Sequence, residues 1–236
     1  MESNDDIVKL GETAEPLGDG FYIIQRRDVY RFGSDAVALA TFASKDIRRG
    51  FDVLDLCSGC GVVGILVAIA TGARVLGAEL DETLFDMSVR SVKLNGLCDV
   101  RFVNADLREV KRFYPNAENG IDPSRGAAEN RNRFSAVVCN PPYYKSDSKP
   151  SAISPAANSE LTVAFRDVAE TAANSLGQGG AAYFVHTAGR LDEVLCECRA
   201  LGLTPKKLIV NVNGKTFLLK CVKGGKSGLT VTTEEF

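Results

Sequence analysis

Two stretches of this 236-residue chain hold residues whose types and spacing suit chemistry at a bound ligand. The first runs from Asp55 to Gly64 and includes Gly59 and Gly61. Glycines between a strand and a helix let the backbone approach a ligand closely, as in nucleotide-binding turns. A carboxylate ahead of the loop would repel a pyrophosphate but suits a ligand that carries positive charge. The stretch predicts such a site, although a glycine-rich turn that binds nothing would show the same pattern.

The second stretch is Asn140-Pro141-Pro142-Tyr143, which directly follows an apolar run. Two consecutive prolines remove two backbone donors and stiffen the turn, so that the carbonyls before them are left free. Asn140 and Pro141 each offer an acceptor oxygen, and Tyr143 offers a flat face. The two oxygens can accept both hydrogens of an NH2 group whose ring stacks on the tyrosine. The stretch therefore predicts a site for a planar amine, unless Tyr143 is a core aromatic beside a rigid turn.

Two more acids follow apolar runs between these stretches. Glu79 comes twenty residues after Gly59, where an open α/β site presents an acid to a ribose diol. Asp106, which follows Ala105, could accept from an adenine amino group. Either acid could instead cap the helix after it, and the sequence leaves both possibilities open.

Strands and helices alternate from residue 53 onward, which predicts a mainly parallel sheet with ligands beyond the carboxyl ends of its strands. The expected strands cover residues 53–56, 74–79, 100–103, 134–139, 180–185, 206–212 and 216–222. The expected helices cover residues 62–71, 82–95, 160–176 and 189–201. Only Asn213-Gly214-Lys215 separates the last two strands, so we expect seven strands with one antiparallel edge strand.

The segment 1–50 is expected to form a lead-in that packs on the site, ahead of one domain over residues 51–236. Its first twenty residues are polar, and residues 20–25 and 29–32 predict a small hairpin. A helix over residues 36–44, capped by Ser34 or Asp35, should pack beside the ligand end of the sheet.

Two polar stretches predict surface loops. They cover residues 115–133 and 145–158, and the second is a candidate substrate lid.

The overall charge does not indicate a nucleic-acid-binding protein. The hydrophobic share of 45% and charged share of 25% fit one α/β domain, and the net charge is −2. Residues 199–233, however, carry seven basic residues and no acid. These bases are either nucleic-acid contacts or a solvated face.

Seven cysteines at irregular spacings do not form a disulfide framework, which indicates a reducing cytoplasm. Cys57-x-x-Cys60 lies inside the glycine loop, and together with Cys196-x-Cys198 and the single histidine it does not supply four convergent zinc ligands, so no metal is expected. The chain lacks an apolar run of about 18 residues and its acidic start is no signal peptide, so no membrane partner is expected.

The combination of Asp55-Leu-Cys-Ser-Gly-Cys-Gly, Glu79, Asp106 and Asn140-Pro-Pro-Tyr resembles the class I S-adenosylmethionine-dependent methyltransferases that act on amino or amide nitrogens. Residues 20–42, the Asn-Pro-Pro-Tyr-Tyr turn and residues 223–229 look like the bacterial tRNA(Val) adenine-N6 methyltransferase family. The resemblance covers nearly the whole chain. It implies a Rossmann-like fold, S-adenosylmethionine as the cofactor, and methylation of adenine N6 in RNA, in a tRNA anticodon loop.

The resemblance also implies roles for particular residues, among them a segment around Phe32 that closes over the cofactor. The expected catalytic residues are Asn140, Pro141, Pro142 and Tyr143. The expected cofactor-binding residues are Phe32, Ser34, Asp55, Cys57, Ser58, Gly59, Gly61, Glu79, Leu80, Ala105, Asp106 and Asn140. The candidates for RNA phosphate contacts are Arg26, Arg27, Arg31, Lys145, Lys149 and the lysine-rich tail.

Two other functions stay open. A protein glutamine N5-methyltransferase that acts on release factors shares the Asn-Pro-Pro-Tyr signature. Such enzymes usually carry an N-terminal helical domain, whereas residues 1–50 here predict a hairpin and one helix. The second alternative is a module that binds S-adenosylmethionine without catalysis.

Overall fold

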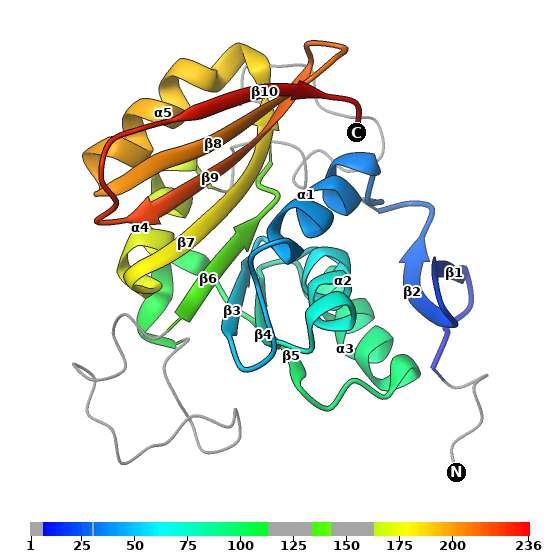
Figure 1. Ribbon diagram of the computed structural model, residues 1–236. Coiled ribbons are helices and arrows are strands. Elements are labelled where there is room, and N and C mark those ends of the chain that lie inside the picture. The colour runs from blue at the N-terminus through cyan, green and yellow to red at the C-terminus, as the bar shows by residue number, and fades with distance from the viewer. Residues whose placement is uncertain (1–6, 30, 113–133, 143–162) are drawn as a thin grey trace.

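A central sheet of eight strands organises the protein (Figure 1). The computed structural model describes residues 7–29, 31–112, 134–142 and 163–236. The strand order is β10-β8-β9-β7-β6-β3-β4-β5. The strands are β3 (Asp52–Leu56), β4 (Arg74–Glu79), β5 (Val100–Asn104), β6 (Phe134–Cys139), β7 (Leu176–Thr187), β8 (Leu203–Asn211), β9 (Thr216–Lys223) and β10 (Thr230–Glu234). Neighbouring strands are parallel except that β9 is antiparallel to both β7 and β8.

The mainly parallel sheet is confirmed, with two corrections. The predicted seven strands become eight, because β10 adds to the edge of β8 in parallel. The antiparallel strand, predicted at an edge, is interior. The tight turn between β8 and β9 makes them antiparallel neighbours, but β9 also pairs with β7 and so separates β7 from β8.

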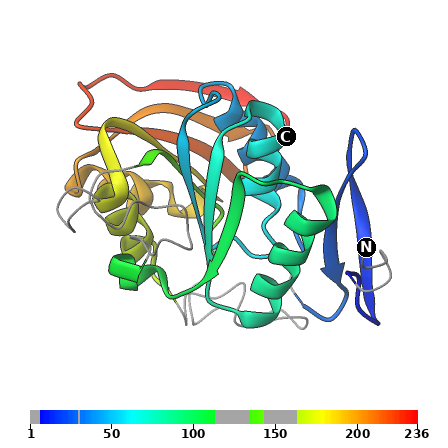
Figure 2. The same cartoon turned by 90° about the horizontal axis from the view of Figure 1, so that it is seen from below.

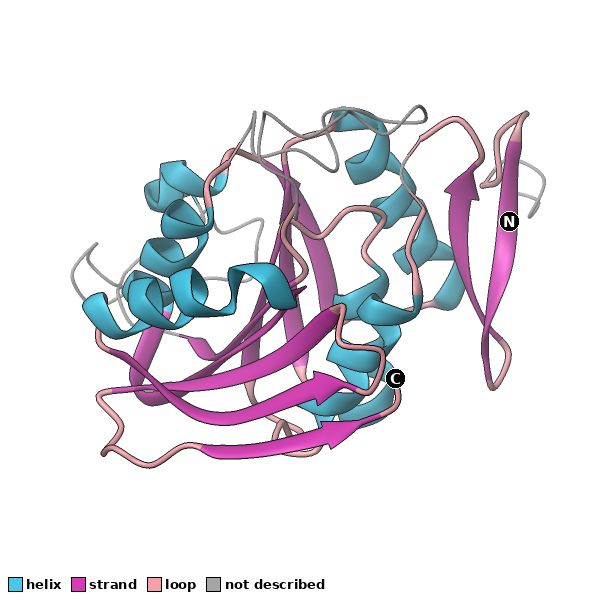
Figure 3. Ribbon diagram, turned by 90° about the horizontal axis from the view of Figure 1, so that it is seen from above, coloured by secondary structure: helices cyan, strands magenta, loops and turns pink. Residues whose placement is uncertain are grey.

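Helices cover both faces of the sheet (Figures 1 and 3). One face carries α1 (Ser34–Ser44), α2 (Val62–Thr71) and α3 (Glu82–Asn95). The other carries α4 (Phe165–Ser175), α5 (Leu191–Ala200) and the short 3-10 helices η2 (Leu107–Arg112) and η4 (Ala188–Arg190). The sheet thereby divides the core into two apolar clusters, one beneath each layer of helices.

The amino-terminal segment forms a two-stranded hairpin outside the main sheet (Figure 2). Its strands are β1 (Glu12–Gly18) and β2 (Phe21–Arg26). The predicted strand over residues 20–25 is confirmed as β2, but its expected partner at 29–32 is wrong, because β2 pairs with the preceding strand β1. Gly18, Asp19 and Gly20 all have positive φ (96°, 49° and 81°), so the reversal occurs there, inside the segment expected to be a polar lead-in.

The hairpin is held against α3 by polar contacts. Ser91 and Asn95 accept the amides of Ile24 and Tyr22 at 2.9 and 2.8 Å. Arg90, only 11% exposed, donates to the nearly buried Glu12 at 2.6 and 2.7 Å. Glu12, which lies in the segment expected to be a polar lead-in, therefore has a structural role.

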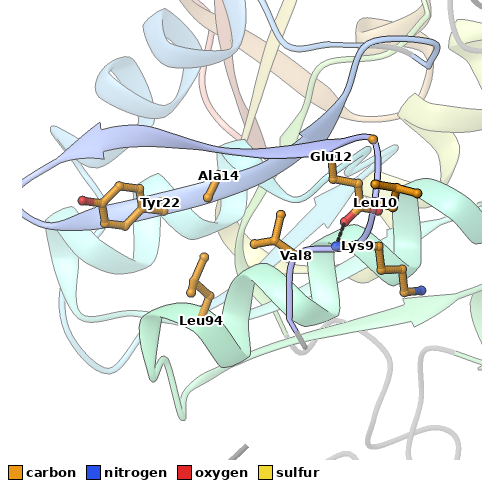
Figure 4. Close-up of a pocket in the computed structure, with 8 residues that line it drawn as sticks. Val8, Lys9, Leu10, Glu12, Ala14, Tyr22 and Leu94 are labelled. Carbon is orange, nitrogen blue, oxygen red and sulfur yellow. Dashed lines mark hydrogen bonds between the residues drawn. The ribbon is translucent and has the colours of Figure 1, made fainter. Parts of the chain in front are cut away.

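A groove of about 750 Å³ lies between the start of β1 and α3 (Figure 4). Val8, Tyr22 and Leu94 line it, and Leu94 lies in the last turn of α3. Since α3 starts where β4 ends, that last turn lies away from the carboxyl ends of the parallel strands. The groove is thus separate from the residues predicted to do chemistry.

Candidate active site

The predicted ligand loop follows β3 directly, and Asp55 on β3 is buried beneath it. Its Oδ2 accepts the Gly64 amide at 2.9 Å, which ties the strand to α2. No described residue hydrogen-bonds to its buried Oδ1. Burial raises the pKa of Asp55 to about 8, with the Gly64 amide opposing the shift and nearby Glu79 adding to it. A positive charge near Oδ1 would stabilise the ionised carboxylate.

Glu79, at the end of β4, holds the same loop. Its Oε2 accepts the Gly59 amide at 2.7 Å and its Oε1 accepts the Asp81 amide at 2.9 Å. Burial raises the pKa of Glu79 as well. The cap of α3 is Asp81, whose Oδ1 accepts the amides of Thr83 and Leu84. Glu79 thus supports the loop and the start of the cap, and each of its oxygens keeps a second lone pair for a ligand.

The glycines of the loop serve different purposes. A Cβ on Gly59, where φ is 57°, would meet nothing within 4 Å. A Cβ on Gly61, where φ is 88°, would lie 2.5 Å from the Phe102 ring, and one on Gly64 would lie 2.9 Å from Asp55 Oδ2. Gly61 and Gly64 are therefore required by packing, and Gly59 is the position where a ligand can approach the backbone.

The remaining loop residues also hold the turn in place. The Ser58 amide donates to the Ala78 carbonyl at 3.0 Å. The Ser58 Oγ is buried and has no hydrogen-bond partner among the described residues. Cys57 has a positive φ of 54° and is half-buried. Its side chain packs on the apolar cluster that contains Cys139, the last residue of β6, and raises the pKa of that thiol.

Asp106 follows β5, as predicted, but its carboxylate has local partners. Its Oδ1 accepts the Arg108 amide at 2.9 Å at the start of η2, and the Arg108 guanidinium is ion-paired to it. This ion pair holds the pKa of Asp106 below its usual range. The predicted alternative, a cap for the following helix, is what the structure shows, and binding of adenine by Asp106 stays a prediction.

Neighbouring backbone contacts join the ends of β4 and β5. The Ala105 amide donates to the Glu79 carbonyl at 3.0 Å, and Asn104 Nδ2 donates to the same oxygen at 2.9 Å. Leu80 is half exposed just beyond β4. Asn104 was not among the predicted site residues, although its position before Ala105 could have indicated it.

Asn140, Pro141 and Pro142 follow β6, which lies beside β3 in the sheet. Because Leu56 pairs with Cys139, Asn140 emerges next to the start of the ligand loop. Pro141 is buried, while Asn140 and Pro142 are half-buried. Tyr143, Lys145, Lys149 and the predicted loops at 115–133 and 145–158 lie outside the described residues.

The helix predicted before the loop is confirmed as α1, which packs against α2 and against β6, β7 and β9. Phe32 packs on the apolar cluster beneath these helices, and Ser34 is exposed at the first position of α1. The predicted caps are wrong: Gly33 occupies the N-cap position, and no side chain caps the helix. Asp35 instead accepts from Thr216 Oγ1 at 3.4 Å.

Two of the three predicted RNA-binding arginines are paired within the chain. Arg26 lies 2.6 Å from Asp28, and Arg31 is ion-paired with Glu15. Arg27 is exposed and forms no ion pair with any residue that the structure describes. Arg27 is thus the strongest of the three candidates for a phosphate contact.

In the described ranges, no group of three or more His, Cys, Asp or Glu side chains could hold a metal ion. No helix there is both long enough and apolar enough to cross a membrane.

Comparisons with known proteins agree with this arrangement. The chain is 25% identical over 130 residues to a tRNA1(Val) (adenine(37)-N6)-methyltransferase of Flavobacterium johnsoniae, covering 55% of this chain and 48% of that protein. It is 31% identical over 84 residues to a tRNA (guanine(6)-N2)-methyltransferase of Thermus thermophilus, covering 35% of this chain and 25% of that protein. The chain thus spans about half or less of the curated relatives it matches. No family model matches it.

Among solved structures, a predicted O-methyltransferase from Agrobacterium tumefaciens superimposes with a TM-score of 0.59 at 22% identity. The superposition covers 85% of this chain and 86% of that one. With the strand order and the loop after β3, these similarities define a class I S-adenosylmethionine-dependent methyltransferase fold. Since the three proteins are named for methylating different atoms, the fold alone does not specify the substrate.

Proposed function

We propose that this chain is an S-adenosylmethionine-dependent methyltransferase that methylates the N6 atom of adenine in RNA, in a tRNA anticodon loop. The observation that carries the proposal is the position of Asn140-Pro141-Pro142 beside the loop of Cys57–Gly61 at the ends of β6 and β3. The similarity to a tRNA adenine-N6 methyltransferase over 55% of the chain supports the same substrate class.

The residues around the loop fit the cofactor. S-adenosylmethionine supplies an electrophilic methyl group on a positively charged sulfur, beside an amino group and a ribose diol. Asp55 Oδ1, buried without a described partner, is available to a positive charge. Glu79 is available to the diol hydroxyls, and the open side of Gly59 leaves room for the ligand. We assign these three residues to the cofactor.

The turn after β6 would act on the adenine amino group. That nitrogen is a poor nucleophile because its lone pair is delocalised into the ring. Asn140 Oδ1 and the Pro141 carbonyl accept the two amino hydrogens and draw them out of the ring plane, which localises the lone pair. Alignment of this nitrogen with the methyl group of the cofactor then supplies much of the rate enhancement. No strong base is needed, because the nitrogen becomes acidic as it is methylated. We propose that Tyr143 stacks on the base and contributes about 1–3 kcal/mol.

The RNA would approach from the side of the amino-terminal segment. We propose that residues 1–50, with Arg27 exposed near the end of the hairpin, serve as an RNA-facing addition to the methyltransferase domain of residues 51–236. Lys145 and Lys149 are proposed to contact phosphates as well.

The test is transfer of a labelled methyl group from S-adenosylmethionine into unmodified total tRNA, followed by nucleoside analysis. N6-methyladenosine is the expected product. Asn140→Ala should lower kcat by on the order of 100-fold, roughly 3 kcal/mol, with an unchanged thermal midpoint. Activity within threefold of wild type would refute the role of Asn140. Label in glutamine of a release factor, with none in tRNA, would establish the protein glutamine methyltransferase instead.

A further inference from the structure

Two thiols meet between the ligand loop and the turn after β6. Cys57 begins the loop after β3 and Cys139 ends β6, and these two parallel strands are neighbours with Leu56 opposite Cys139. Both side chains pack on the same apolar cluster, beneath α4 and α5, and Cys57 is near enough to raise the pKa of the Cys139 thiol. Strand pairing and side-chain direction therefore bring Cys57 and Cys139 together, although they are far apart in the sequence.

The sequence would suggest a different partner for Cys57. Cys60 completes a Cys-x-x-Cys motif with it, but Cys60 is buried in the cluster on the other face of the sheet, against α1 and α2. Its pKa is raised to about 12 by burial, so it stays a protonated core residue. The pairing is set by the strand order and not by the motif.

A second thiol pair provides a comparison within the same molecule. Cys198 on α5 and Cys221 on β9 also lie in the cluster that contains Cys139, where Cys198 raises the pKa of Cys221, and both are 0% exposed. Cys57 is half-buried and lies at the ligand loop. The two pairs thus share a contact and differ in access from solvent.

We propose that Cys57 and Cys139 form a reversible disulfide when the protein meets a peroxide, and that this bond switches off ligand binding at the loop. The Cys57 thiolate attacks one peroxide oxygen, which breaks the O–O bond, releases water after protonation and leaves a sulfenic acid on Cys57. The Cys139 sulfur then attacks the Cys57 sulfur; the S–S bond forms, the S–O bond breaks, and a second water leaves with the Cys139 proton. Two thiols lose two electrons to one peroxide, and an added dithiol reverses the change.

The environment of each thiol sets the order of these steps. Burial raises the pKa of Cys139 well above its ordinary value, and its contact with Cys57 adds to the shift. Cys139 therefore remains protonated and, at 0% exposure, out of reach of the oxidant, while Cys57 is only half-buried. Cys57 reacts first and Cys139 resolves the sulfenic acid.

Closing the bond requires the site to move. Non-bonded atoms sit about 3.5–4.0 Å apart, whereas disulfide sulfurs lie about 2.05 Å apart. The loop or the turn at Asn140 must shift by on the order of 1 Å. A displacement of that size lowers the reaction rate by about 100-fold where groups are held in position for reaction. The effect on methyl transfer rests on the proposed function, but formation of the disulfide does not.

The experiment treats the reduced protein with hydrogen peroxide and maps peptides without reduction. We expect one linked peptide pair, Cys57 with Cys139, and an intact mass lower by about 2 Da per bridge. The exposed Cys98 and Cys196 are internal references for oxidant exposure. If these two are oxidised while Cys57 and Cys139 stay unlinked, or if Cys57 links to Cys60, the proposal is wrong.

Matched variants separate the bridge from general damage. Cys139→Ala should keep basal ligand binding, form no bridge and retain binding after peroxide, whereas Cys198→Ala should bridge like wild type. Thermal unfolding verifies that each variant is folded, and Cys57→Ser provides a second unbridged variant.

In wild type, the affinity for S-adenosylhomocysteine should fall by on the order of 100-fold after oxidation and recover with dithiothreitol. A bridge that leaves this affinity unchanged would overturn the switch.

The ligand-binding readout distinguishes this proposal from the proposed function. If the reduced protein methylates no RNA, yet the bridge forms and weakens S-adenosylhomocysteine binding as expected, the switch stands and the RNA assignment falls.

Discussion

Glu79 Oε2 accepts a hydrogen bond from the Gly59 amide at 2.7 Å, so the end of β4 holds the loop that follows β3. The second oxygen of the same carboxylate accepts the Asp81 amide, which links the loop to the start of α3. One buried acid therefore positions the loop and also presents acceptors at its edge.

This arrangement predicts that Glu79→Ala weakens cofactor binding. Losing hydrogen bonds to a charged acceptor costs about 1.5–3 kcal/mol each, which corresponds to roughly 10- to 150-fold in affinity. Calorimetric titration with S-adenosylhomocysteine measures the change. Glu82→Ala, at an exposed position of the same helix start, is the control and should bind like wild type. Unchanged binding by Glu79→Ala would show that the diol does not bind there.

Asp55 predicts a specific dependence of stability on pH. Its pKa is raised by burial to about 8 in the folded protein, above the ordinary value of 3.8. The folded state thus holds a proton that the unfolded state has lost, so this group makes stability fall as pH rises from about 4 to 8, by at most about 1.4 kcal/mol per pH unit. Urea unfolding at several pH values should show a flatter profile for Asp55→Asn. Parallel profiles would contradict the raised pKa.

The sequence predicted the central strands well because buried parallel strands are continuous apolar runs. The bounds of β4, β6 and α3 match the predicted ranges at 74–79, 134–139 and 82–95. The strand β10 was missed because its polar residues form a strand only through pairing with β8. The hairpin was misplaced because Glu12 looked solvated, whereas Arg90, on α3, is its partner.

The positions of the described candidate site residues were predicted to a similar extent, whereas their roles stay predictions. Asp55, Glu79 and Asn140 follow apolar runs, so their places at the carboxyl ends of strands could be inferred from order alone. The contact of Cys57 with Cys139 could not, because it depends on β3 and β6 being neighbours while two strands intervene in the sequence.

Arg90 predicts how firmly the hairpin is held. Burial alone would raise the pKa of Glu12, but the hydrogen bond from Arg90, the hydrogen bond from the Lys9 amide and the charges of Arg90 and Lys9 together outweigh it, and the pKa is lowered. Arg90→Met should therefore cost about 3 kcal/mol at pH 7, as for a broken buried ion pair. Since a lowered carboxylate pKa stabilises above its unfolded value, the difference from wild type should shrink as pH falls below about 4. Urea unfolding measures the free energy of unfolding and its dependence on pH. The control is Arg27→Met, at an exposed position. An equal loss of stability in the two variants would refute the pairing of Arg90 with Glu12.

A substitution of Arg27 tests where RNA binds in the proposed function. As an exposed base it should contribute one phosphate contact, so Arg27→Ala should weaken tRNA binding and reduce the slope of log K against log salt by about 0.7–0.9. Filter binding at several salt concentrations measures this slope. Arg199→Ala is the control, because Arg199 is exposed in the last turn of α5, at the opposite edge of the sheet. If the slope falls in Arg199→Ala alone, the RNA surface lies instead among the basic residues of 199–233.

The same substitution should have different consequences at Gly59 and Gly61: a loss of ligand binding at the first position and a loss of stability at the second. Gly61→Ala combines a positive φ of 88° with a Cβ 2.5 Å from the Phe102 ring, so it should lower stability by about 2–4 kcal/mol. The double variant Gly61→Ala/Phe102→Leu should recover part of that loss. Gly59→Ala meets open space, so it should cost only about 1–2 kcal/mol of strain yet weaken S-adenosylhomocysteine binding at least tenfold, because the methyl group occupies the side left for the ligand. Chemical unfolding and calorimetry distinguish the two effects. If Gly59→Ala binds the ligand like wild type, the cofactor does not approach the backbone at that position.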